Sequence, residues 1–76
     1  MARFSEYALW KMSQRGIERD DVELVLIDAD ADWKSREPPF RHIYARRVGD
    51  RPIHVVVEPF DHEEVVTAFV PDTRED

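Results

Sequence analysis

The sequence has 76 residues and no cysteine, so it is long enough for one domain but cannot form disulfides or thiolate metal sites. Its formal net charge of −6 argues against broad, non-specific binding to nucleic acid, which needs a positive field. No apolar run approaches the roughly 20 residues that span a bilayer, so we expect a cytoplasmic protein, without membrane contact, that forms a single domain over residues 1–76.

A first helix is predicted between Ser5 and Gly16. Serine is a preferred N-cap residue, and glycine readily adopts the left-handed conformation that ends many helices. At 100° per residue, Ala8, Leu9 and Met12 share one face of this helix, so we expect them in the core. Both ends of the first helix are therefore encoded locally.

A second helix is predicted over residues 19–29. Asp20 and Glu23 have the spacing of a capping box, although a start at Glu18 is also compatible with the sequence. The apolar stripe expected to face the core consists of Val22, Val25, Leu26 and Ala29.

Three large apolar side chains lie outside the core-facing stripes of the two helices: Trp10, Leu24 and Ile27. For the second helix, either the sheet wraps around it or a partner covers its outer side. Tryptophan is also enriched at binding hot spots. We therefore predict that these three residues form an interface with a protein partner or with a second copy of the chain in a homodimer.

From residue 40 onward the hydrophobic pattern changes to the period of two that is typical of strands. We expect strands over Phe40–Val48, Ile53–Glu58 and Glu64–Val70, with a short edge strand around Trp33–Arg36 as a fourth. The short links between them permit only antiparallel neighbours. The predicted fold class is α+β, with two N-terminal helices packed on a three- to four-stranded antiparallel sheet.

Strict alternation predicts which side chains of the last two strands share a face. These triplets are Ile53, Val55 and Val57 in the central strand, and Val65, Thr67 and Phe69 in the last. In the hairpin, a turn at residues 49–51 would place His42 near Val57 and His54 near Arg46. The charge of Arg46 would then lower the pKa of His54, which favours a neutral general base near pH 7. The alternative is that His54 is a solvent-facing strand residue.

Residues 33–54 carry six basic and two acidic side chains, a balance of +4 within an acidic chain. Arginines with an aromatic neighbour suit RNA, because guanidinium groups hold phosphates and stack on bases. RNA binding through this segment is therefore one interpretation. The other is that the arginines form cross-strand ion pairs with Glu58, Asp61, Glu63 and Glu64.

Metal and cofactor sites are not predicted. The three histidines, at positions 42, 54 and 62, do not have the helical spacing of a zinc motif, and no cysteine supports them. The sequence also contains no phosphate-binding loop and no nucleophile motif. We therefore expect no metal and no cofactor.

The segment Tyr7–Ile17 reads Tyr-Ala-Leu-Trp-Lys-Met-Ser-Gln-Arg-Gly-Ile, and later segments read Gly-Asp-Arg-Pro-Ile (49–53) and Val-Thr-Ala-Phe (66–69). Their order resembles a bacterial domain-of-unknown-function family with the signature His-Ala-x-x-Arg-Met-x-x-Arg-Gly-Ile. This family is in turn similar to the BrnT and RelE/ParE toxins. The resemblance implies a bacterial or phage origin and a RelE/BrnT-like arrangement of two helices on an antiparallel sheet.

The resemblance also implies a function, a metal-independent endoribonuclease of a toxin–antitoxin system. The catalytic residues on the sheet would be Arg41, Tyr44, Arg46 and His54. The residues that contact nucleic acid would be Lys11, Arg15, Arg47 and Arg51.

Two signature positions differ in this chain: the histidine is Tyr7, and the first arginine is Lys11, which cannot clamp a phosphate with two parallel hydrogen bonds. The preferred interpretation is therefore a non-catalytic or diverged protein-binding module. The ribonuclease is the alternative.

Overall fold

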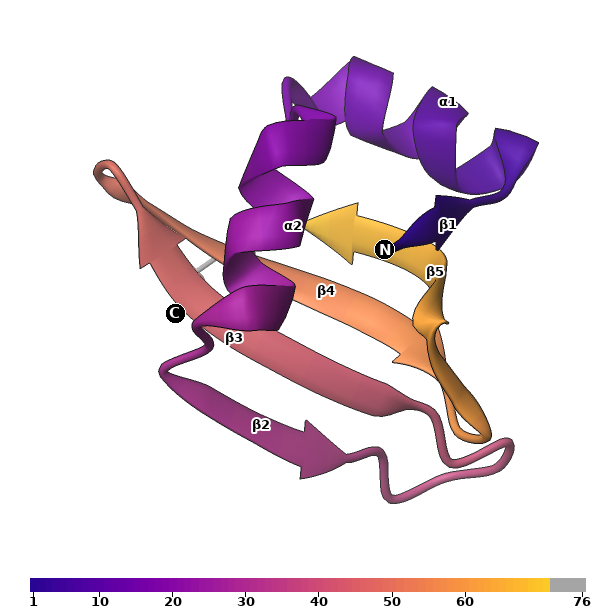
Figure 1. Cartoon of the computed structure of the whole chain (residues 1–76). Helices are drawn as coiled ribbons and strands as arrows, with labels where there is room; N and C mark the ends of the chain where they lie inside the picture. Colours follow the sequence, from indigo (N-terminus) through magenta and orange to yellow (C-terminus); the bar gives the residue numbers. More distant parts are fainter. Residues whose placement is uncertain (72–76) are drawn as a thin grey trace.

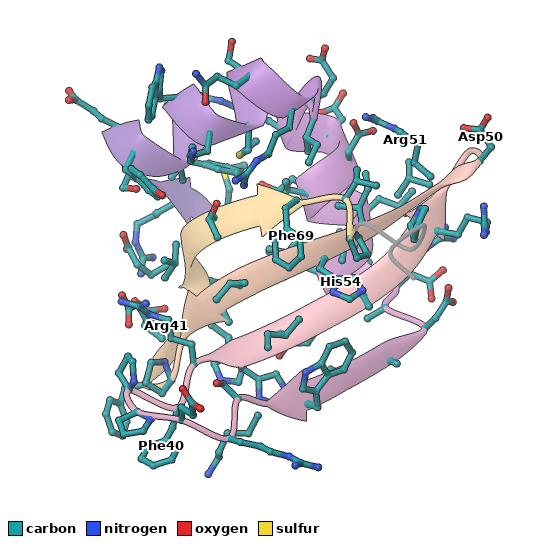
Figure 2. The ribbon with its side chains drawn as sticks, turned by 180° about the vertical axis from the view of Figure 1, so that it is seen from behind. Phe40, Arg41, Asp50, Arg51, His54 and Phe69 are labelled. Carbon is teal, nitrogen blue, oxygen red and sulfur yellow. The ribbon has the colours of Figure 1, made fainter. Side chains whose placement is uncertain are left out.

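The computed structural model describes residues 1–71, which form two helices and one five-stranded sheet (Figure 1). The elements in chain order are β1 (Arg3–Phe4), α1 (Glu6–Arg15), α2 (Arg19–Ile27), β2 (Ala31–Lys34), β3 (His42–Val48), β4 (Arg51–Glu58) and β5 (Asp61–Phe69). Across the sheet the order is β1-β5-β4-β3-β2. Both helices lie on one face, and no helix or strand of the described chain covers the other face (Figures 1 and 2). The predicted α+β class is confirmed.

Helix α1 has the boundaries that its sequence predicts. The side chain of Ser5 accepts a hydrogen bond from the backbone N–H of Ala8 at 3.0 Å. At the other end Gly16 has φ +68°, and the backbone N–H of Ile17 donates to the carbonyl of Met12 at 2.9 Å. Both ends therefore satisfy backbone groups that a helix leaves without internal partners.

Helix α2 begins after Glu18, whose backbone N–H donates to the carboxylate of Asp21 at 2.9 Å. The start at Glu18 is therefore confirmed and a cap at Asp20 is wrong. On the outer side, 38% of Leu24 and 80% of Ile27 is exposed, so the sheet does not wrap around this helix. Neither helix in residues 1–71 is long and apolar enough to cross a membrane.

The core lies between the helices and the central strand β4. Ile53, Val55 and Val57 share the helix-facing side of β4, as predicted, and each is 0% exposed. The other fully or almost fully buried residues are Ala8, Met12, Ile17, Val22, Val25, Val65 and Ala68. Leu9, which was expected in the core, is only partly buried.

The sheet differs from the predicted three- to four-stranded antiparallel sheet because a fifth strand makes it mixed. β1 pairs in parallel with β5, which places Phe4 beside Val65. A strand of two residues is too short to leave a periodic pattern in the sequence. Ion pairs between β1 and β5 stabilise the pairing: the Arg3 side chain contacts Asp61, Glu63 and Glu64. The edge strand β2 is present but begins two residues before the predicted start.

Strand β5 contains a bulge at Val66, because Val65 and Thr67 pair with consecutive residues of β4. Beyond this bulge Ala68 is buried, whereas Thr67 and Phe69 turn to the opposite face. The prediction that Val65, Thr67 and Phe69 share one face is therefore wrong. One extra residue reverses the alternation of every side chain that follows it.

We expect the substitution Met12→Ala to lower the free energy of unfolding by about 2–5 kcal/mol, because Met12 is almost completely buried and its truncation leaves a cavity in the core. That is a large part of the roughly 4–11 kcal/mol expected for a chain of this length. Urea denaturation followed by circular dichroism measures the change. Ser13→Ala, at an exposed position next to it, is the control and should change stability by less than ~0.5 kcal/mol. Equal effects at the two positions would contradict this description of the core.

Candidate functional site

The four residues predicted to form a catalytic site on the sheet lie on two different faces. Residues that pair across neighbouring strands share a face, and both Tyr44 and Arg46 pair with core residues of β4. They therefore lie on the helix-covered side. His54 lies on the opposite side, where Figure 2 shows it together with Arg41. The structure does not bring these four side chains into one patch.

His54 is paired with Ala45 rather than placed beside Arg46, whereas His42 pairs with Val57 as expected. Its ring instead lies between two aromatic side chains: the centroid distances are 5.3 Å to Trp33 and 5.4 Å to Phe69. Burial lowers the pKa of His54 from its ordinary value. The direction agrees with the prediction, but the cause is burial and not the charge of an arginine.

The arginines of the basic segment are engaged within the protein. Arg46 donates from Nε to the carbonyl of Asp28 at 2.9 Å and forms an ion pair with the carboxylate of that residue at 3.3 Å. Arg41 lies 3.6 Å from Glu58. This cross-strand pair is one of those expected in the alternative interpretation, in which the arginines neutralise neighbouring acids.

The residues predicted to contact nucleic acid also make internal contacts. Two of them connect α1 to the sheet: Arg15 donates to the carbonyl of Ala68 at 2.9 Å, and Arg51 donates to the carbonyl of Gly16 at 3.0 Å. Arg51 thereby supplies a cation to the C-terminal end of α1, where the helix dipole favours positive charge. The other contacts are from Arg47 to the carbonyl of Asp50 at 2.9 Å, and from Lys11 to the ring of Trp10 at 5.1 Å.

A different group of polar side chains comes together on the helix side of the sheet. His42 Nε2 and Asp32 Oδ1 are 2.7 Å apart, and the hydroxyl of Tyr44 is 2.8 Å from His62 Nδ1. The rings of His42 and His62 stack with centroids 4.8 Å apart and planes 24° apart. We call Asp32, His42, Tyr44 and His62 the histidine cluster.

The hydroxyl of Tyr44 can be the donor in the hydrogen bond that it shares with His62. Burial raises the pKa of Tyr44, and the negative charge of Asp32 raises it further, so its hydroxyl stays protonated near neutral pH. When this hydroxyl donates to His62 Nδ1, a neutral imidazole carries its proton on Nε2. His62 can then donate a hydrogen bond from Nε2 to a ligand.

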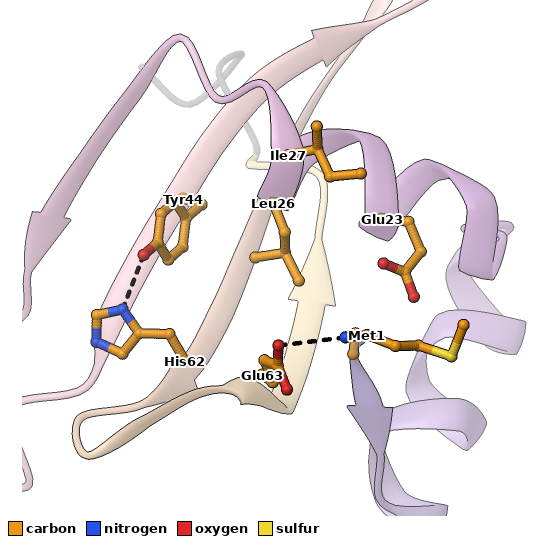
Figure 3. Close-up of a pocket in the computed structure, with 8 residues that line it drawn as sticks. Met1, Glu23, Leu26, Ile27, Tyr44, His62 and Glu63 are labelled. Atoms are coloured by element: carbon orange, nitrogen blue, oxygen red, sulfur yellow. Dashed lines mark hydrogen bonds and ion pairs between the residues drawn. The ribbon is translucent and has the colours of Figure 1, made fainter.

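Two clefts meet at His62. The first, of about 250 Å³, lies beside the end of α2 and is shown in Figure 3. Its walls include Leu26, Ile27 and Tyr44, and the N-terminal ammonium of Met1 bonds to Glu63 at 3.2 Å along one side. The second cleft, of about 350 Å³, lies between the loop before β3 and the β4–β5 turn; its lining residues are Lys34, Pro39, Phe40, His42, Pro59, Phe60 and His62.

Phe40, on the wall of the second cleft, has a left-handed backbone with φ +60°. Such a conformation costs a residue with a side chain about 1–3 kcal/mol. A hydrogen bond from the backbone N–H of Phe40 to the carbonyl of Glu37 at 2.8 Å holds it in place. Backbone strain of this kind is concentrated at ligand sites and active sites, which directs attention to this cleft.

On the face of the sheet away from the helices, apolar side chains form a strip across four strands, and Arg47 and Thr67 lie on the same face. Ile43 pairs with Trp33 on one side and with Val56 on the other, and Phe69 of β5 pairs with His54 of β4. Trp33 is 41% exposed. We call Trp33, Ile43, His54, Val56 and Phe69 the open face; Figure 2 is drawn from this side.

The three predicted interface residues are all exposed but belong to separate surroundings. Trp10, 55% exposed, lies 6.2 Å from the ring of Tyr7 on α1. Leu24 and Ile27 are on α2, where Ile27 lines the first cleft. Exposure of all three agrees with the predicted role without testing it.

The open face and the histidine cluster could be predicted from the sequence only in part. Alternation within β4 places His54 and Val56 on the same side, but Phe69 joins them only because of the bulge. His42 is the first residue of β3 and His62 is the second residue of β5, so their stacking depends on the way β5 returns beside β4. The predicted pairing of His42 with Val57 could have indicated this contact, because it places His42 close to the β4–β5 turn.

Among the residues described, no three His, Cys, Asp or Glu side chains are placed so that they could hold one metal ion. Comparison with known families shows that the chain belongs to the family described as "Domain of unknown function (DUF4258)", which it matches over residues 4–70. Neither the comparison with curated proteins nor the comparison with solved structures gives a match.

We expect His54→Gln to reduce the loss of stability between about pH 7.5 and about pH 5.5. The pKa of His54 is lowered in the folded state, so the unfolded chain takes up a proton there that the folded chain resists, and stability falls as the pH drops. Urea unfolding of the wild type and the variant across this range measures the difference. Curves that stay parallel would show that His54 does not contribute to the pH dependence.

Proposed function

We propose that this chain is a non-catalytic protein-binding module and that the open face of its sheet is the main contact surface. The observation that carries the proposal is the apolar strip on this face, which no helix or strand of residues 1–71 covers (Figure 2). Antiparallel sheets with one face in water normally alternate apolar residues inside with polar residues outside. Here Ile43, Val56 and Phe69 lie on the side away from the core, next to the exposed ring of Trp33.

The distribution of charge supports the same proposal. Most of the cations that would hold RNA phosphates are instead bound to carbonyls and carboxylates of the protein itself, as described for Arg15, Arg46 and Arg51. The apolar face includes a tryptophan, a residue type that often dominates binding energy at interfaces. A partner that covers this face would remove apolar surface from water at about 25 cal/mol per Å².

Trp10, Leu24 and Ile27 remain a second proposed contact region on the helix side. Their exposure supports this role. Because they lie on the two helices and the open face lies behind the sheet, one partner molecule that touches both regions would have to reach around an edge of the domain.

A toxin-type ribonuclease with a RelE/BrnT-like fold is the second candidate. Two helices on one face of a largely antiparallel sheet support the proposed relationship, and the pairs Asp32–His42 and Tyr44–His62 supply groups that can transfer protons. The separation of His54 from Tyr44 and Arg46 weighs against the catalytic site predicted on the sheet.

The binding proposal is tested with a photo-reactive benzoylphenylalanine at position 56, on the open face, in cells of the native host. We expect a discrete cross-linked adduct, either with a second copy or with another protein, that is lost when Trp33→Ser is added. The same cross-linker at the exposed position 14 on α1 is the matched control and should give no such adduct. Absence of an adduct at position 56, together with a strict monomer by light scattering, would contradict the proposal.

The two candidates also differ in what the purified chain does to RNA. The binding module is expected to leave both free RNA and ribosome-bound message intact, and its expression should not arrest growth. Cleavage that His62→Gln abolishes and His54→Gln retains would instead favour a ribonuclease that uses the histidine cluster.

A further inference from the structure

We propose that the second cleft, between Lys34 and Phe60, binds a small planar organic anion: an aromatic ring that carries a phosphate or a carboxylate group. This site goes beyond the protein-binding function proposed above. It is formed by different residues, on the helix side of the sheet, whereas the open face lies behind the sheet.

The walls of the cleft suit a flat apolar ring. Pro39 and Phe40 come from the loop before β3, and Pro59 and Phe60 come from the β4–β5 turn. The volume of about 350 Å³ falls within the range of small-molecule sites. Phe60 is 99% exposed although it is a large aromatic residue, and a stacked ligand would remove that surface from water.

The polar part of the cleft suits an anion. Lys34 supplies a positive charge, and His62 can donate from Nε2 in the tautomer whose Nδ1 accepts from the Tyr44 hydroxyl. Among the described residues that line the cleft, none carries a carboxylate, although the net charge of the chain is −6. Two acids close to the lining residues are already paired: Asp32 with His42, and Asp61, between Phe60 and His62 in the chain, with Arg3.

The cleft brings its charged and aromatic groups together from two separate segments. Lys34 pairs with His42 across β2 and β3, which places its side chain on the same face as the histidine cluster. Phe40 lies between them in the chain, in the left-handed conformation described above. The strain at Phe40 is therefore located where the ring of the ligand would be held.

The experiment is a titration of the full chain, followed by ¹H–¹⁵N and histidine side-chain NMR, with phenyl phosphate, benzoate, phenol and inorganic phosphate as separate probes. We expect phenyl phosphate or benzoate to shift the signals of Phe40, His42, Phe60 and His62, and to bind more tightly than phenol or inorganic phosphate. The tighter of the two anions identifies the phosphate or the carboxylate as the preferred group. Binding of inorganic phosphate as tightly as phenyl phosphate, or of neither aromatic anion at millimolar concentration, would overturn the proposal.

Substitutions at exposed positions distinguish specific binding in the second cleft from a general attraction of anions to positive charge. Lys34→Ala should weaken binding of the preferred anion roughly tenfold or more, as expected for the loss of a charge-assisted hydrogen bond. Arg19→Ala removes the same charge at the start of α2 and should change binding less than about twofold. Phe60→Ala, in an exposed turn, should weaken the aromatic anion but leave inorganic phosphate unchanged. Equal weakening by Lys34→Ala and Arg19→Ala would overturn the proposal.

Discussion

The rest of the structure depends on the alternation of side chains along β4. Ile53, Val55 and Val57 point toward the helices and are completely buried, so His54 and Val56 must point the other way. The two helices have ten and nine residues and lie on one side of the sheet. The chain therefore builds a one-sided core and leaves an apolar strip on the opposite face.

Because the two helices are short, they also leave part of their own side of the sheet without a helix above it (Figure 1). Asp32, His42, Tyr44 and His62 meet on this side of the sheet, where Asp32 bonds to His42, Tyr44 bonds to His62, and the two histidine rings stack. In contrast, the arginines near the helices are used to join elements. Arg51 caps the end of α1, and Arg46 holds the carbonyl that follows α2. The positive segment of the sequence thus contributes chiefly to the fold.

The features predicted correctly from the sequence are those encoded within a few residues. The cap at Ser5, the left-handed glycine at Gly16 and the alternation in β4 depend on neighbours in the chain. The parallel strand β1 and the bulge at Val66 depend on contacts between distant segments, so no local sequence pattern predicts them.

The predicted contact between His54 and Arg46 failed for a related reason. Placing His54 beside Arg46 requires a hairpin register one residue away from the observed one, in which His54 opposes Ala45. A shift of one residue in the register exchanges the faces on which strand side chains lie, so the register decides whether His54 and Arg46 can share a site. The position of Trp10, Leu24 and Ile27 outside the core-facing stripes was easier to anticipate, because it needs only the helical period.

The most direct test of the one-sided core is solvent paramagnetic relaxation of methyl groups in a dilute solution of the chain, with a neutral gadolinium chelate as the probe. The methyl groups of Val55 and Val57 should be protected, whereas those of Ile43 and Val56 should broaden strongly. Similar protection of Val55 and Val56 would contradict an uncovered apolar face, and with it the surface on which the proposed binding function depends.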